Sequence, residues 1–136
     1  TNSATGMSAQ SIRMNTIASN LANADNVGST PESTYHSKYP IFSEITANLP
    51  GLNKADQPTG GVKVDRIQQS TKPLDQRYQP THPMANKDGY IYVTDVNPIE
   101  QMTNMISASK DYQANVEVMK TTVNMIMQSL NVLGSK

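Results

Sequence analysis

The last third of the chain carries two series of residues that each repeat every seven positions without a break. The first series is Met102, Ser109, Val116, Val123 and Leu130, and the second, three residues further on, is Met105, Tyr112, Met119, Ile126 and Leu133. Two such series occupy the a and d positions of five consecutive heptads, so their side chains form one narrow stripe along a long helix. All of them except Ser109 are suited to burial. The stripe therefore predicts packing against other helices, and with it assembly rather than catalysis.

A shorter stripe of the same kind lies near the N-terminus and predicts a helix from about residue 3 to residue 24. It consists of Met7, Met14 and Leu21, with Ile17 and Ala24 three residues on. The residues between these positions are mostly Ser, Thr, Asn and Gln, and Arg13 is the only charge. Because such residues are weak helix formers, we expect packing to hold this segment helical. The run from Ala24 to Gly28 predicts the end of the helix.

The second helix has a well-defined predicted start. The sequence Asn97-Pro98-Ile99-Glu100 places a capping side chain, a proline at the first helical position and a glutamate at the third. We expect this helix to run to about Leu133, a length of roughly 50 Å at about 1.5 Å per residue. It should end where Gly134 takes the left-handed conformation.

The polar face of this second helix carries few charges. Between residues 99 and 133 the charged residues are Glu100, Lys110, Asp111, Glu117 and Lys120, and there are none from residue 121 to residue 135. A helix exposed to water on its back normally carries charges there, whereas neutral polar side chains also suit contacts with other helices. The pattern favours a helix surrounded by neighbours, with a soluble two-helix domain as the alternative.

Residues 27–97 are rich in proline and glycine and predict an extended connector with a small β-rich region. Short strands are predicted within Tyr35–Ile45, at Val62–Ile67 and at Tyr90–Val93. The segment between the last two strands is too long for a tight hairpin, so we expect a wide loop with a small sheet at its base. The predicted organisation is a helical assembly domain, residues 1–26 and 98–136, and the connector and β-rich region between them.

The fold class that follows is mainly α. The N- and C-terminal helices are expected to form an antiparallel coiled-coil hairpin, with a small β-containing, loop-rich middle region. The apolar stripes of one chain bury too little surface to offset the entropy of ordering both ends. We therefore expect both ends to be largely disordered in the free monomer and to become helical when neighbouring copies cover their remaining faces.

Composition narrows the classes of function. The 136 residues suffice for one domain, and the eleven basic and eleven acidic residues cancel. No net field therefore attracts nucleic acid or anionic lipid, and no apolar run reaches the length of a membrane span. No secretory signal pattern is evident at the N-terminus. The chain has no cysteine, which excludes disulfides, thiolate metal sites and a cysteine nucleophile.

The sequence contains no convincing catalytic or metal-binding motif. His36 and His82 lie in proline-bounded loops without a second ligand at helical spacing, and Asp88 and Asp95 are typical of turns. The segment Thr59-Gly60-Gly61 lacks the following Lys-Ser or Lys-Thr of a phosphate-binding loop. We therefore expect no enzyme activity and no cofactor. The alternative is a small loop-rich binding or hydrolase module with a coiled-coil dimerisation stem.

Two stretches of the sequence resemble the bacterial flagellar axial proteins. The segment from Ala18 to Asp25 is similar to the Asn-rich signature of rod and hook proteins, and the segment from Ser107 to Val118 is similar to their C-terminal Tyr-Gln-Ala-Asn block. The short length, the segment Thr59–Val64 and the segment Asp88–Ile91 narrow the resemblance to the proximal rod proteins of the C type. The resemblance extends over nearly the whole chain.

This resemblance implies a structural subunit of the flagellar basal-body rod. Its terminal helices would polymerise into a helical tube that forms part of the proximal drive shaft, which transmits torque from the membrane ring toward the hook. The implied partners are copies of itself, rod proteins of the B, F and G types, membrane-ring and rod-adaptor proteins, and the flagellar export apparatus. The implied location is the rod within the periplasm, reached by export without a cleaved signal peptide.

The expected assembly interface combines the apolar stripes with residues carried over from the resemblance. The resemblance implies that the amides of the N-terminal helix end bridge neighbouring backbones and that the small Ala114 permits close approach, while ordinary helix surface or capping is the alternative for each amide. The expected interface residues are Met7, Met14, Ile17, Asn20, Leu21, Asn23, Ala24, Met102, Met105, Tyr112, Gln113, Ala114, Asn115, Val116, Met119, Val123, Ile126, Leu130 and Leu133.

Overall fold

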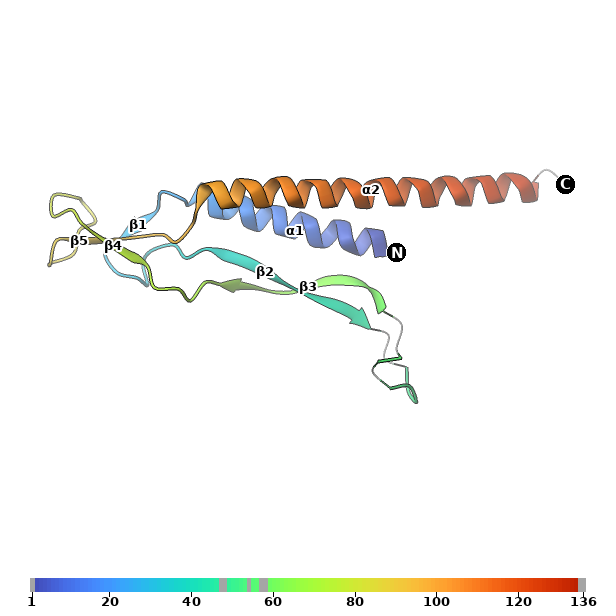
Figure 1. Cartoon of the computed structure of the whole chain (residues 1–136), viewed down its shortest axis with the longest axis horizontal. Helices are drawn as coiled ribbons and strands as arrows, with labels where there is room; N and C mark the ends of the chain where they lie inside the picture. Colours follow the sequence, from blue (N-terminus) through green and yellow to red (C-terminus); the bar gives the residue numbers. More distant parts are fainter. Residues whose placement is uncertain (1, 47–48, 54, 57–58, 135–136) are drawn as a thin grey trace.

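The computed structural model describes residues 2–46, 49–53, 55–56 and 59–134, so residues 1, 135 and 136 of the predicted helical domain lie outside it. Within these ranges the chain forms two helices and five strands (Figure 1). The helices are α1 (Asn2–Ala22) and α2 (Pro98–Gly134). The strands are β1 (Val27–Gly28), β2 (Lys38–Thr46), β3 (Thr59–Gln69), β4 (Asp75–Tyr78) and β5 (Tyr90–Val93).

The predicted start of α2 is confirmed by its hydrogen bonds. The Asn97 side-chain oxygen accepts from the backbone N–H of Ile99 at 3.0 Å and of Glu100 at 3.3 Å, and Pro98 is the first helical residue. This arrangement satisfies two of the N–H groups that a helix start leaves without partners.

α2 runs to Gly134, which agrees with the predicted end at about Leu133, but the predicted left-handed conformation of Gly134 is wrong. Gly134 is still helical, and the described glycines with positive φ are Gly51, Gly61 and Gly89. The segment that ends α1 also differs from the prediction, because Gly28 belongs to β1 and does not cap the helix. The chain turns instead through backbone hydrogen bonds from Asn23, Ala24 and Asn26 to carbonyl groups three or four residues earlier.

The strands form two separate sheets. β2 and β3 pair as an antiparallel hairpin whose register shifts twice, and β5 lies between β1 and β4 in a three-stranded antiparallel sheet. The strands predicted at Val62–Ile67 and Tyr90–Val93 fall within β3 and on β5, but they lie in different sheets instead of sharing one at the base of the loop. β4 was not predicted, because its sequence Asp-Gln-Arg-Tyr does not alternate and all four residues are exposed.

The prediction of a mainly α coiled-coil hairpin is wrong. The helices are separate elements joined through five strands, and the middle region contains strands of nine and eleven residues, β2 and β3, rather than short pieces in a loop. The hairpin of β2 and β3 packs along α1, so α1 has α2 on one side and strands on another (Figure 1). α2 has 37 residues and α1 has 21, so the longer helix extends well beyond the shorter one.

The prediction of only short strands in the proline-rich segment has a physical explanation. Pro40 lies inside β2, in a sheet of only two strands. Each strand of such a sheet has an open edge, where a missing N–H breaks no hydrogen bond of the ladder. The many prolines of this segment therefore argue against a strand in the centre of a sheet, but they do not argue against a strand at its edge.

The hydrophobic core is thin. Its buried apolar residues are Ala9, Ile17, Leu74, Ile91, Val96 and Ala108. Ala9, Ile17 and Ala108 come from the two helices, and the other three come from the segments around β4 and β5. Most of the large apolar side chains of α2 are left exposed, including all of those beyond residue 121.

Candidate assembly surface

A polar junction fixes the end of α1 against the rest of the chain. Asn20 is 1% exposed, and its side chain makes four hydrogen bonds. The amide nitrogen donates to the Lys38 carbonyl at 2.8 Å and to Gln101 Oε1 at 3.1 Å, while the amide oxygen accepts from the Lys38 N–H at 2.9 Å and the Tyr35 hydroxyl at 2.8 Å. One side chain therefore joins α1 to β2, to α2 and to the loop before β2.

Neighbouring residues support this junction. Ser19 Oγ lies 3.1 Å from the Tyr35 hydroxyl, and Asn26 Oδ1 accepts from the Tyr35 N–H at 2.9 Å. Asn23, by contrast, donates to the carbonyl of Ser19 within its own helix at 2.8 Å. The two amides of the predicted Asn-rich signature thus differ: Asn20 bridges elements of the same chain, and Asn23 helps to close the last turn of α1.

Asp95 forms a second polar connection, just before α2. Its carboxylate accepts from the backbone N–H of Ser37 at 2.7 Å and from the Ser37 hydroxyl at 3.0 Å. Burial raises the pKa of Asp95, but hydrogen bonds from the Ser37 backbone and from the side chains of Ser70 and Ser37 outweigh it, so the pKa lies below its ordinary value. The prediction that Asp95 makes a turn missed this role, because its partners lie far away in the sequence.

Small residues and one ion pair bring α1 and α2 together. A Cβ at Gly6 would lie 2.7 Å from Asn115 Oδ1, so glycine permits a close approach of the helices there. Ala108 is fully buried, and Arg13 Nη1 lies 3.5 Å from Asp111 Oδ2. The ion pair is partly exposed and contributes on the order of 0 to 1 kcal/mol. The ion pair therefore adds little, and the small residues allow the two helices to lie close together.

Beyond α1, no other described element packs over the predicted stripe. All residues from 121 to 134 are exposed. Val123 is 50% exposed, Ile126 54%, Leu130 59% and Leu133 70%. We call these four residues the open stripe. A shallow hollow lies at the N-terminal end of the open stripe, beside the start of α1. Its lining includes Met7, Val116, Met119 and Val123.

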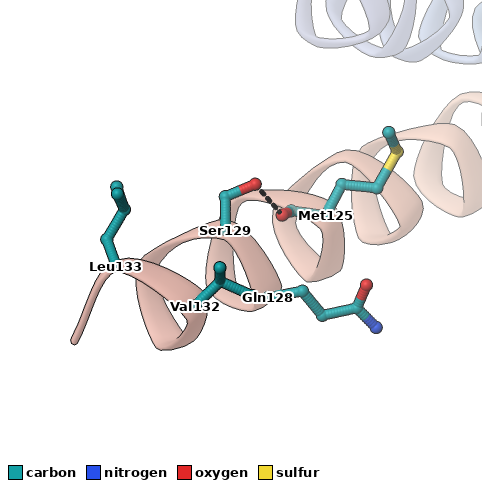
Figure 2. A pocket seen from close by; sticks show the side chains of 5 residues that line it. All are labelled: Met125, Gln128, Ser129, Val132 and Leu133. Carbon is teal, nitrogen blue, oxygen red and sulfur yellow. Dashed lines mark hydrogen bonds between the residues drawn. The ribbon is translucent and has the colours of Figure 1, made fainter. Parts of the chain in front are cut away.

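A second group of apolar side chains lies on a different face of the same helix segment. A shallow hollow there is lined by Met125, Gln128, Ser129 and Val132, with Leu133 of the open stripe at its edge, and all five project from α2 (Figure 2). The Ser129 hydroxyl donates to the Met125 carbonyl at 3.0 Å. The sequence prediction did not include Met125 or Val132, although their separation of seven residues is the same signal that identified the first stripe.

The predicted interface residues fall into three groups in the single chain. Ile17 and Asn20 are buried inside it. The half-buried members are Met7, Met14, Leu21, Asn23, Ala24, Met105, Tyr112, Asn115, Val116 and Met119. The exposed members are Met102, Gln113, Ala114 and the four residues of the open stripe.

The other candidate residues take part in local backbone contacts. His36 Nε2 lies 2.9 Å from the Pro31 carbonyl, and His82 Nδ1 accepts from the Met84 N–H. The Asp88 N–H donates to Asn86 Oδ1 in the turn before β5, where Gly89 has a φ of 84°. The described ranges contain no cluster of three or more His, Asp or Glu residues suited to a metal ion. Neither described helix combines the length and apolar character that a membrane span needs.

Both ends of the chain match family models of flagellar rod proteins. Residues 1–28 match the model described as flagella basal body rod protein, and residues 87–132 match the model described as flagellar basal body rod FlgEFG protein C-terminal. These segments contain α1 and most of α2, so the helices that carry the exposed apolar surface lie in the parts of the chain that are similar to flagellar rod proteins.

Similarity to individual proteins extends over the middle region as well. The chain is 44% identical to the flagellar basal-body rod protein FlgC of Buchnera aphidicola subsp. Schizaphis graminum, over 93% of this chain and 89% of the relative. It is 40% identical to FlgC of Salmonella typhimurium over the same shares, and 32% identical to FlgC of Bacillus subtilis over 96% of this chain and 93% of the relative. The chain belongs to the FlgC family of flagellar basal-body rod proteins, and it is a structural subunit of that rod.

Proposed function

We propose that this rod subunit polymerises through its terminal helices, and that the open stripe of α2 is the part of the chain that neighbouring subunits cover first. The observation that carries the proposal is a helix end that is uncharged and exposed at every position from 121 to 134 and that includes the four apolar side chains of the open stripe. Monomeric proteins rarely expose a contiguous apolar patch of this kind unless it binds a partner.

The energy of this contact is modest for one pair of subunits. Full burial of a Val, Leu or Ile side chain contributes about 1.5 to 3 kcal/mol, and the four residues of the open stripe keep half or more of their surface exposed. Covering them therefore contributes on the order of 3 to 6 kcal/mol per copy. Association alone costs about 4 kcal/mol or more. Stable assembly then requires each helix to contact several neighbours at once, as in a shaft.

The same energetics bear on the state of the free chain. α1 is held by the Asn20 junction and by packing against α2 and the hairpin of β2 and β3. Residues 121–134 have no such support, and an isolated helix of this length is marginal in water. We propose that this end of α2 frays in the free monomer and becomes a stable helix in the rod.

The assembled subunit would form part of the proximal drive shaft and transmit torque from the membrane ring toward the hook. We propose as partners copies of this chain, rod proteins of the B, F and G types, membrane-ring and rod-adaptor proteins, and the flagellar export apparatus. The rod would lie in the periplasm, and the chain would be exported without cleavage of a signal peptide. We propose no catalytic role, and no observation on the described residues favours a hydrolase or binding module with a dimerisation stem.

The test compares two adjacent substitutions in flagellated cells. Leu130→Glu places a charge in the open stripe, and Asn131→Glu places the same charge one residue on, toward the face that carries the ion pair between Glu117 and Lys120. We expect Leu130→Glu to reduce incorporation of the chain into purified basal bodies, and swimming, by at least tenfold, while Asn131→Glu incorporates normally. Equal incorporation of both variants at equal cellular levels would show that the open stripe does not drive assembly.

A further inference from the structure

α2 carries a second apolar stripe, whose residues do not belong to the first stripe, the seven-residue repeat from Met102 to Leu133. Val118, Met125 and Val132 are seven residues apart and are 54%, 63% and 67% exposed. Each directly precedes a residue of the first stripe, Met119, Ile126 or Leu133. Consecutive residues of an α-helix are about 100° apart around the axis, so the second stripe runs parallel to the first on a distinct face.

The surroundings of the second stripe are neutral. Figure 2 shows Met125 and Val132 beside Gln128 and Ser129 on α2. The hydroxyls of Ser129 and Thr122 donate to the carbonyls of Met125 and Val118 at 3.0 Å, so they already have partners within the helix. The charges of this half of α2 lie elsewhere: Glu117 and Lys120 form an ion pair at 3.8 Å, with side chains 75% and 68% exposed.

The neutrality of this face limits what it can bind. A charged side chain placed on it would lose its hydration without gaining an opposite charge, which is costly. The matching surface is therefore an uncharged helix face with apolar residues on the same seven-residue repeat. In this chain, the buried face of α1 is already used against α2 and the strands. The open stripe of α2 has the required character and length, but it belongs to the same helix and so must come from a second copy.

The two faces also fit the geometry of a growing assembly. Two copies related by a two-fold axis use the same face twice and close into a dimer, whereas contacts between two different faces continue into rings or filaments. We infer that the second stripe of one copy, Val118, Met125 and Val132, packs against the open stripe of the next copy, Val123, Ile126, Leu130 and Leu133. This inference rests on the proposed polymerisation through α2 and names the two faces that meet.

The size of the contact indicates where it forms. A standard protein interface buries about 800 Å² on each partner. Three or four side chains that are already partly covered by their own helix supply only a fraction of that area. The contact is therefore too small for a stable dimer of free chains, and it should be detected in the assembled rod.

Cross-linking through introduced thiols tests the inference, because the chain has no cysteine of its own. Two tagged copies are expressed together in flagellated cells, one with Met125→Cys and the other with Ile126→Cys. Purified basal bodies are treated with a bismaleimide whose spacer is about one helix diameter, roughly 10 Å. We expect a dimer that carries both tags, and at least tenfold less of it when Asn131→Cys replaces Ile126→Cys. The pair Val132→Cys and Leu133→Cys is a second test of the same contact.

Several results would overturn the inference. A dimer formed by Met125→Cys alone in equal yield would mean that the same face meets itself. Cross-linking of Met125→Cys to a different rod protein, with no dimer of this chain, would assign the second stripe to another partner. Normal incorporation of both pairs without a doubly tagged dimer would exclude the contact. These outcomes concern the second stripe only, whereas failure of the proposed polymerisation would appear as normal assembly of Leu130→Glu.

Discussion

Replacement of Asn20 by alanine tests whether the polar junction holds α1 in place. The substitution removes all four hydrogen bonds of the side chain and leaves the N–H and carbonyl of Lys38 without those partners. The Tyr35 hydroxyl keeps a contact with Ser19 Oγ at 3.1 Å, so it is not counted as orphaned. Gln101 Oε1, which is buried, loses its hydrogen bond as well. A buried polar group that loses its partner costs about 1 to 3 kcal/mol, and the two Lys38 groups are only partly buried, so the three groups together cost roughly 2 to 6 kcal/mol.

This loss is large compared with the whole stability of a small domain, which is about 5 to 15 kcal/mol. The measurement is urea unfolding of the dilute chain, followed by circular dichroism. We expect Asn20→Ala to lose at least about 2 kcal/mol. Asn23→Ala is the matched control: it removes one hydrogen bond, to Ser19 O, from a half-buried side chain, and should cost about 0.5 to 1.5 kcal/mol.

Two results would refute this reasoning. Equal losses for Asn20→Ala and Asn23→Ala would mean that the junction contributes no more than an ordinary hydrogen bond within a helix. A dilute wild-type chain without any cooperative unfolding transition would mean that the junction does not form in a single chain, and that α1 becomes helical only on assembly.

Two further predictions concern the middle region and the ends. The pKa of Asp95 is lower in the folded chain than its ordinary value of 3.8, so its hydrogen bonds stabilise the fold above that pH, and this stability is lost as the pH falls through the folded pKa. The urea midpoint of the wild-type chain should therefore drop between about pH 5 and pH 2, and it should drop less in Asp95→Asn. An equal drop in both chains would contradict this role. Gly61 has a φ of 124°, and a Cβ there would meet the Thr5 side chain, so Gly61→Ala should destabilise by about 1 to 3 kcal/mol. Gly134→Ala, in a helix with open space around it, should be neutral or gain up to about 1 kcal/mol, and similar losses in both variants would argue against strain at Gly61.

The helices could be predicted from the sequence because their signals are local and periodic. The cap at Asn97 and the seven-residue repeat from Met102 to Leu133 involve neighbouring positions on one element, and the structure has both features. The strand at Tyr90–Val93 was predicted for the same reason, since it follows a turn at Asp88-Gly89 and is rich in β-branched and aromatic residues.

The contacts between elements could not be predicted in this way. Ser37 and Asp95 are 58 positions apart, and Asn20 and Gln101 are 81 apart, so no periodic pattern links them. The pairing of β2 with β3 also depends on two register shifts that hydrophobic alternation does not reveal. The prediction of a helical hairpin failed for a related reason. Within the chain it gave α1 only α2 as a partner, whereas β2 and β3 also pack along α1.

The hydroxyl groups along the far end of α2 have a mechanical consequence. Thr121, Thr122 and Ser129 each donate to a carbonyl four residues earlier in their own helix, at 3.0 Å. In the proposed assembly, these three hydroxyls would therefore have no hydrogen left to donate to a neighbouring helix, and their contacts would depend on side-chain shape. At such positions adjacent helices would slip past one another by small amounts without breaking a donated bond, which would give the shaft some compliance under load.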